Sequence, residues 1–232
     1  MKKIPRNELM DSSFEQELSD IILKNEDYRY LPWIGCDFKS QSKKLMIVAE
    51  SVYLWGEGTE VCASEPDFGR TILYDQALDF DNNFKSKPMF PNFMKAFTGL
   101  NNIDNGAKNE FWKSVVFHEL VQVPMANEKS RPTKNDFNTG AKYLVELVEL
   151  LLPNTIIIFG TDWRNKYVPI KMAFENLQYK TLSQIFFDKI NRSYPRVLTM
   201  SKADHEVKII FMKHPSQRFS PQKWHLFIAP NI

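Results

Sequence analysis

Two segments of the sequence place side chains that can do acid–base or hydrogen-bonding chemistry directly after an apolar run. Glu50 follows the run 44–49, and His214 follows the run 207–211, with Ser216 two residues further on. A carboxylate in such a position can orient or activate a water molecule, and an imidazole can stabilise negative charge on a leaving group. Each residue also has a structural alternative. Glu50 can pair with a Lys or Arg or cap a helix, and His214 can cap the next helix or pack on the proline beside it.

The pattern around these residues predicts strands that alternate with helices. Apolar runs predict buried strands over 44–49, 114–123, 155–159, 197–200 and 207–211. Capping residues and helical spacing predict helices over 13–25, 71–78, 92–98, from Thr133 to Pro153, from Pro169 onward and over 220–227. We therefore expect a three-layer α/β/α sandwich with a mainly parallel central sheet, whose functional loops lie at the carboxyl ends of the strands.

Length and composition are those of one soluble domain. The chain has 232 residues, of which 43% are hydrophobic and 25% charged. We expect a single domain over 1–232, in which 1–43 supply an N-terminal helix and a packing segment. No stretch approaches the roughly 20 apolar residues of a membrane helix, and no apolar segment follows the basic N-terminus. The sequence thus predicts a cytoplasmic protein with no membrane partner. It does not give the oligomeric state, for which a monomer is the default expectation.

Charge and cysteine content narrow the possible partners and cofactors. A net charge of +2 is too small for a protein that coats nucleic acid, so any DNA binding requires a local basic cluster. Cys36 and Cys62 are too few for a disulfide framework, a zinc site or an iron–sulfur cluster. His205 and His225 do not have the spacing of metal ligands. We expect neither a metal nor an organic cofactor.

Five segments in a fixed order carry a family resemblance. They are Leu45–Tyr53, Phe117–Pro124, Arg131–Thr133, Leu152–Gly160 and Met212–Ser216. This ordered set resembles the uracil-DNA glycosylase superfamily and is closest to the family-four type, with the first segment similar to its first motif and the His-Pro-Ser segment similar to its second. The resemblance spans roughly 45–227 and implies the uracil-DNA glycosylase-like version of the α/β/α fold.

The resemblance implies roles for the residues around a flipped base. Glu50 would handle the attacking water, and His214 would polarise the base carbonyl. Tyr53 or Phe68 would stack on the base, with Trp55 as a further candidate. Glu119 would occupy the position of the residue that reads the base edge; if the alignment is shifted, His118 or Gln122 would read it instead.

The base-reading position differs from the family in a chemically important way. The family has Asn there, whose amide offers one donor and one acceptor, whereas an ionised Glu119 only accepts hydrogen bonds. Such a pocket favours a base edge with more donors, or it requires a protonated carboxyl group. In the first motif, Ala49 replaces Gly, and Ser51-Val52 replaces Ala-Pro, so the backbone of this loop is expected to differ from that of the family.

The candidate DNA contacts lie in two loops. Arg131 and Lys213 are placed to contact phosphates, and Ser216 can contact a phosphate or cap the loop. Gln217, Arg218 and Phe219 stand where the family inserts a wedge into the duplex, and Arg218 and Phe219 can fill the space left by the flipped nucleotide.

Two functions follow from the resemblance. The first is a DNA glycosylase that hydrolyses the N-glycosidic bond of a flipped, damaged base such as uracil, with DNA as partner. The second is a catalytically inactive relative that binds nucleic acid or nucleotides, which the changes at Ala49 and Glu119 and the small net charge favour. A small-molecule α/β enzyme unrelated to this family is a third possibility.

Overall fold

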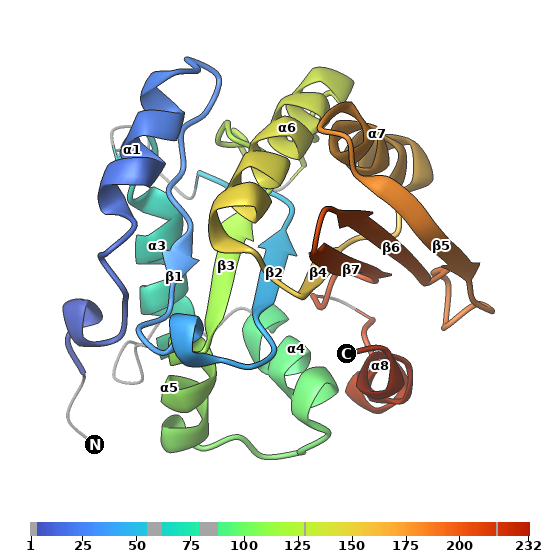
Figure 1. Cartoon of the computed structure of the whole chain (residues 1–232). Coiled ribbons are helices and arrows are strands. Elements are labelled where there is room, and N and C mark those ends of the chain that lie inside the picture. The colour runs from blue at the N-terminus through green and yellow to red at the C-terminus, as the bar shows by residue number, and fades with distance from the viewer. Residues whose placement is uncertain (1–3, 55–61, 79–87, 128, 217) are drawn as a thin grey trace.

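A mixed seven-stranded sheet forms the centre of the molecule, here in a computed structural model that describes residues 4–54, 62–78, 88–127, 129–216 and 218–232 (Figure 1). The strand order is β1-β3-β2-β4-β7-β6-β5. The strands are β1 (Trp33–Ile34), β2 (Leu45–Ala49), β3 (Val115–Glu119), β4 (Thr155–Phe159), β5 (Lys180–Phe186), β6 (Arg196–Lys202) and β7 (His205–Met212). The inner strands β3, β2, β4 and β7 pair in parallel. At one edge β1 is antiparallel to β3, and at the other β6 is antiparallel to β7 and β5 to β6.

Helices cover both faces of this sheet. They are α1 (Glu15–Leu23), α3 (Phe68–Leu73), α4 (Met89–Thr98), α5 (Asn105–Lys113), α6 (Lys134–Leu151), α7 (Val168–Asn176) and α8 (Pro221–Ile228). Buried side chains of α6 and α7 pack on one face, and those of α4, α5 and α8 pack on the other. The α/β class is thus confirmed, and the arrangement is consistent with the predicted three layers.

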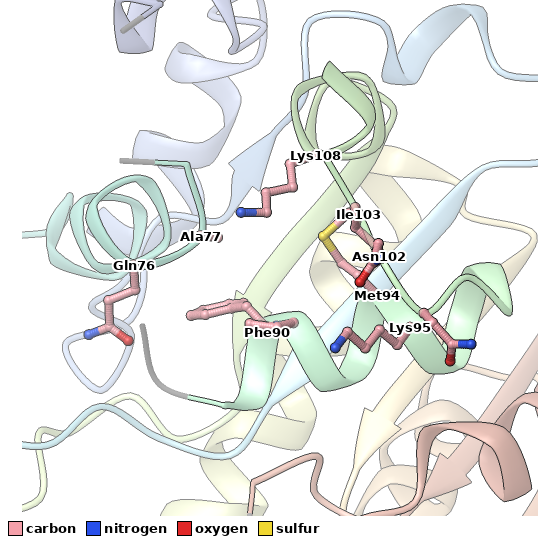
Figure 2. A pocket seen from close by; sticks show the side chains of 10 residues that line it. Gln76, Ala77, Phe90, Met94, Lys95, Asn102, Ile103 and Lys108 are labelled. Carbon is pink, nitrogen blue, oxygen red and sulfur yellow. The ribbon is translucent and has the colours of Figure 1, made fainter. Parts of the chain in front are cut away.

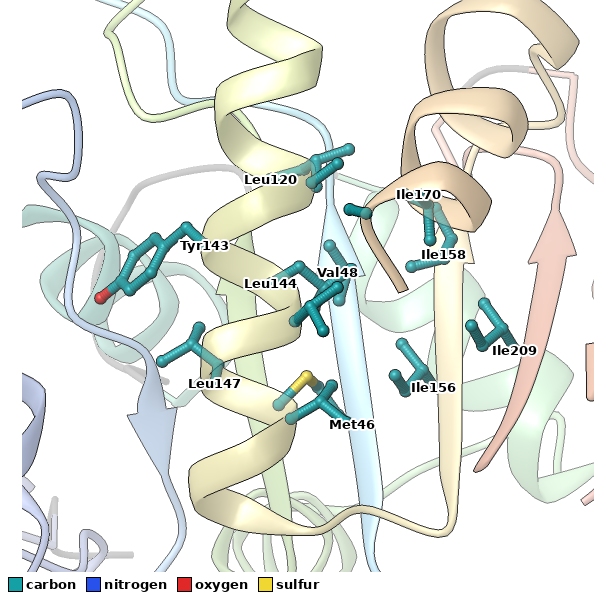
Figure 3. Packing of buried hydrophobic residues seen from close by; sticks show 14 of the residues in the cluster. Met46, Val48, Leu120, Tyr143, Leu144, Leu147, Ile156, Ile158, Ile170 and Ile209 are labelled. Atoms are coloured by element: carbon teal, nitrogen blue, oxygen red, sulfur yellow. The ribbon is translucent and has the colours of Figure 1, made fainter. Parts of the chain in front are cut away.

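The inner strands bury both faces because most of their residues are apolar. In β2, Met46 and Val48 point into the cluster under α6, whereas Leu45 and Ile47 point into the opposite cluster. Figure 3 shows the first of these clusters, in which the side chains of β2, β4 and β7 meet those of α6 and α7. Each fully buried aliphatic side chain contributes about 1.5–3 kcal/mol, so these strands fix the sheet edge from which the polar loops leave.

Most of the predicted elements are confirmed, and the differences have identifiable causes. The second predicted strand ends at Glu119 instead of Val123, so that Glu119 lies at the carboxyl end of β3. Strand β5 was not predicted, because it is an edge strand with no buried face and hence no apolar period. Helix α5 was not predicted either; Asp104 caps it by accepting a hydrogen bond from the Ala107 N–H.

A local cap fixes the start of helix α6, and a close approach at Gly140 places the helix against the segment that follows β3. The predicted cap at its start is confirmed, since the Thr133 hydroxyl accepts from the Asp136 N–H and the Asp136 carboxylate accepts from the Thr133 N–H. Nearly two turns into the helix, Gly140 lies so near Leu120 that a Cβ on it would be 1.9 Å from the Leu120 carbonyl oxygen. The absence of a side chain at Gly140 therefore lets α6 approach the segment that follows Glu119.

None of the helices in the described ranges is long and apolar enough to cross a membrane.

We predict that Gly140→Ala lowers the free energy of unfolding by about 1–3 kcal/mol, because overpacking forces the helix away from β3. Gly69→Ala is the matched control, since a Cβ there would meet its nearest neighbours at 3.9 Å, an ordinary contact distance. Urea unfolding followed by circular dichroism measures both variants. Equal stability of the two variants would contradict the proposed close packing of α6.

Candidate functional site

A pocket of about 540 Å³ opens at the carboxyl ends of the inner strands. Glu50 enters it from the end of β2, Glu119 from the end of β3 and His214 from the loop after β7. The volume falls within the range of about 300–1,000 Å³ that is usual for small-molecule sites. The resemblance places Glu50 and His214 around one flipped base, and both line this pocket. The strands that carry them are not adjacent, because β4 lies between β2 and β7.

The segment that carries Glu50 is held by the chain that follows β3. The Leu120 N–H donates to the Ala49 carbonyl oxygen at 3.1 Å, and the Val121 N–H donates to that of Glu50 at 2.9 Å. Parallel pairing thus continues past the ends of both strands. Further on, Tyr53 forms an isolated parallel bridge with Met125. Glu50 therefore stands on a backbone fixed by the main chain on its β3 side.

A buried lysine lies behind Glu50. Lys166 Nζ is 2.5 Å from a carboxylate oxygen of Glu50 and donates to the Phe159 carbonyl oxygen, also at 2.5 Å. The Lys166 side chain is only 2% exposed, against 25% for that of Glu50. Pairing with a Lys was the structural alternative for Glu50, and the structure contains it. The carboxylate nevertheless lines the pocket, so the ion pair orients it without removing it from the site.

Gly160 makes room for this lysine. It follows β4 directly and has a φ of 118°, a conformation that side chains rarely adopt. A Cβ at this position would lie 2.2 Å from Lys166 Nζ. Lys166 itself comes from a short π-helical turn, Trp163–Tyr167, that leads into α7. The turn and the glycine together bring the ammonium group to the carboxyl end of β4, between Glu50 and His214.

His214 is held as a neutral imidazole. Burial and, to a lesser extent, the positive charge of Lys166 lower its pKa to about 4, and the negative charge of Glu50 opposes this shift. Its ring packs edge-on against Phe159, with centroids 5.8 Å apart. The His-Pro-Ser loop is fixed from α4, because the Asn92 side-chain amide donates to the carbonyl oxygens of Pro215 and Ser216 at 2.9 and 3.2 Å. A neutral imidazole offers one N–H donor and one acceptor nitrogen to a ligand.

The inner wall of the pocket carries two further polar side chains. Glu119 is 4% exposed, and Ser51 is 9% exposed. The Ser51 hydroxyl has no hydrogen-bond partner among the described residues. A buried hydroxyl without a partner loses the hydrogen bonds that it makes in water, so Ser51 is suited to bond a ligand in this pocket.

His118 and Gln122, the alternative base readers, lie away from the pocket, so this assignment is wrong. Successive residues of a strand point to opposite faces, and His118 therefore lies under α6 with its ring edge-on to Tyr143 at 5.1 Å. Its burial is nearly complete and lowers its pKa to about 3. The Gln122 amide accepts from the N–H groups of Arg29 and Tyr30 and donates to the Glu119 carbonyl oxygen. Gln122 joins two loops rather than reading a ligand.

Of the predicted stacking aromatics that the structure describes, Tyr53 lines the pocket and Phe68 does not. Phe68 is wrong for this role, because it is the first residue of α3 and is buried against Tyr30 and Val52 in a separate small cluster. Trp55 lies outside the described residues. Tyr53 is thus the described candidate that can contact a ligand in the pocket.

The predicted DNA contacts do not share one location. Arg131 and Ser216 line the pocket. Lys213 and Arg218 belong to the same loop, where the Lys213 ammonium donates to the Arg218 carbonyl oxygen at 2.6 Å and Arg218 has a positive φ of 53°. Phe219 stacks on Trp224 with ring centroids 6.0 Å apart, so a wedge role would require it to leave this stack. The predicted contact Gln217 lies outside the described residues.

A second pocket of about 270 Å³ adjoins the first, and Gln76 lines both. Figure 2 shows its side chains, among them Phe90 of α4 and the two lysines Lys95 and Lys108. Both ammonium groups point toward the space beside Phe90. Burial lowers the pKa of Lys108. The neighbouring pocket therefore offers positive charge beside the site that contains Glu50 and His214.

The described residues contain no group of three or more His, Cys, Asp or Glu side chains that could hold a metal ion. No protein-family model matches the chain, and comparison with curated proteins gives no match. The functional argument therefore rests on the geometry of the pocket.

Lys166 is the important site residue that sequence reasoning missed. The stretch after the third predicted strand has no clear period, and nothing in it distinguishes this lysine from the other basic residues, which with it number 30. The available signal was the physical requirement that a carboxylate at a strand end be paired. That requirement does not say which lysine or arginine supplies the charge.

We predict opposite shifts of the His214 pKa when either member of the ion pair is removed. Lys166→Met removes a nearby positive charge, so the pKa should rise from about 4 toward its ordinary 6.5. Glu50→Gln removes a nearby negative charge and should lower the pKa further. NMR titration of the imidazole signals measures both variants against the parent protein. A His214 pKa that stays constant, or moves the same way in both variants, would contradict this electrostatic coupling.

Proposed function

We propose that this protein hydrolyses the N-glycosidic bond of a damaged base flipped out of DNA, on a uracil-DNA glycosylase-like fold. The observation that carries the proposal is the presence of Glu50 and His214 in one pocket, with Lys166 bonded to Glu50 behind it. Glu50 can act on the water and the sugar, and His214 can act on the departing base. The segments that carry the family resemblance include Glu50, Glu119 and His214, and the meeting of these three residues in one pocket supports the same fold family.

The leaving group sets the first chemical requirement. When the bond between the base nitrogen and the sugar C1′ breaks, the base departs with the bonding electrons and carries negative charge. His214 is neutral above about pH 4 and can donate its N–H to a carbonyl oxygen of that base. A donor already in place where charge develops stabilises the transition state without reorganisation. The charge of Lys166 acts in the same direction.

The sugar and the water set the second requirement. As the base leaves, the sugar becomes cationic at C1′, and the Glu50 carboxylate can stabilise this charge. The water oxygen then forms the new bond to C1′, and one of its protons passes to Glu50 or to bulk solvent. The departed base recovers a proton from solvent. Lys166 fixes the carboxylate in place and so acts as a positioning residue.

A second candidate function is nucleotide or nucleic-acid binding without catalysis. The ion pair with Lys166 favours it, because the ammonium group already occupies one of the two carboxylate oxygens of Glu50 that could contact the attacking water. The same pocket and the adjoining lysines would then serve recognition alone. Binding without base release distinguishes this function from the first.

We predict that His214→Ala lowers the rate of base release by about 10²–10³-fold, the usual cost of losing one donor to a developing anion. Circular dichroism should show an unchanged fold. The assay uses oligonucleotides that carry uracil, hypoxanthine, alkylated purines or oxidised guanine, with base release read by alkaline cleavage. His205→Ala is the control, because His205 lies near Pro153 and Tyr179, outside this pocket.

Release of a base by the parent protein and its loss in His214→Ala support hydrolysis. Binding of these oligonucleotides with no release of any base would favour the second function instead. Equal turnover by His214→Ala and the parent protein would remove the role assigned to the imidazole.

A further inference from the structure

The pocket has a buried carboxylate in its wall, in addition to the one paired with Lys166. Glu119 is the last residue of β3 and lies opposite Ala49 in the parallel pairing of β2 and β3. Its side chain is enclosed on the outer side by α3, where a Cβ at Gly69 would be 3.9 Å from Glu119 Cγ. Glu119 is only 4% exposed, yet it lines the pocket. Its position is thus fixed by two strands and a helix.

A carboxylate in such a place restricts the ligands that the pocket accepts. An ionised carboxylate offers only acceptors, in a planar fork that matches two neighbouring N–H donors. A ligand that brings a carbonyl oxygen to the same place sets two acceptors against each other in a site shielded from water, where repulsion is strong. The best partner is therefore a planar edge with two adjacent N–H groups.

Nucleobases differ in this respect. The edge of guanine presents N1–H next to the exocyclic amine, which gives two adjacent donors. Hypoxanthine has the same rings and N1–H but lacks the amine, and uracil has one N–H between two carbonyl oxygens. Guanine also has a carbonyl oxygen beside N1–H. The Ser51 hydroxyl, which is buried in the same pocket without a partner among the described residues, can donate to such an oxygen.

We propose that Glu119 makes this pocket selective for bases of the guanine type, by accepting both N–H donors of that edge. The inference rests on the proposed function only in taking the ligand to be a base; it assigns the substrate class, whereas the hydrolysis assay tests the reaction. The pocket volume of about 540 Å³ is large enough to hold a two-ring base together with its sugar. Uracil is disfavoured because it places a carbonyl oxygen against the carboxylate.

The test is the binding of nucleosides to the full chain by isothermal titration calorimetry. Guanosine and inosine form the matched pair, since they differ only in the exocyclic amine. We expect guanosine to bind about tenfold more tightly or better, because a hydrogen bond to a charged group contributes about 1.5–3 kcal/mol and a factor of ten corresponds to about 1.4 kcal/mol. Uridine and 1-methylguanosine, which lacks the N1–H donor, should bind more weakly than guanosine.

The variant Glu119→Gln replaces one acceptor with a donor and should bring guanosine and inosine to within about threefold of each other, since the charge-assisted bond is lost. Glu206→Gln removes the same charge at an exposed position on β7, outside the pocket, and should leave the preference unchanged. If Glu119→Gln fails to fold, the comparison of guanosine with 1-methylguanosine tests the same hydrogen bonds from the ligand side.

These outcomes separate the inference from the proposed reaction. A preference for guanosine that depends on Glu119 supports the inference even if no oligonucleotide loses a base, in which case only hydrolysis fails. Equal binding of guanosine and inosine, no binding of either, or a preference that survives in Glu119→Gln would overturn the inference, whether or not base release is observed.

Discussion

The ammonium group of Lys166 lies almost wholly out of water, and the Glu50 carboxylate and the Phe159 carbonyl oxygen hold it there. An unpaired ammonium group in this place would be costly, so Lys166 and Glu50 must stay together in the folded chain. Their pairing fixes the carboxylate at the pocket wall and places positive charge beside His214, where it adds to the effect of burial in keeping that imidazole neutral. It also requires Gly160, because a side chain there would occupy the space of the ammonium group.

The fold supplies this arrangement through the ends of parallel strands. Strands β2, β3, β4 and β7 all finish at the same edge, and each gives a different group: two carboxylates, the glycine turn before Lys166, and an imidazole. Apolar packing on both faces makes the strands rigid, so the polar loops start from fixed points. The pocket thus combines an anchored acid, a neutral donor and a buried acceptor, which suits a ligand that carries both donors and a developing negative charge.

The sequence predicted much of this and missed what depends on distant contacts. Glu50 and His214 were placed at one sheet edge, because apolar runs that alternate with helices predict parallel strands whose carboxyl ends lie together. His118 was predicted to read a base, but the face to which a strand residue points depends on the register of the strand. Phe68 was predicted to stack on a base, but a helix begins at this residue. The approach of Lys166 depends on the path of a π-helical turn, for which short-range pattern gives no signal. Edge strand β5 has no apolar period and was missed for the same reason.

A crystal structure of the chain soaked with guanosine tests the central claim, which is that the pocket holding Glu50, Glu119 and His214 binds a base. The account predicts electron density for the base between Glu119 and His214, with the sugar toward Glu50. Density for the nucleoside beside Lys95 and Lys108, or at any place away from His214, would contradict it.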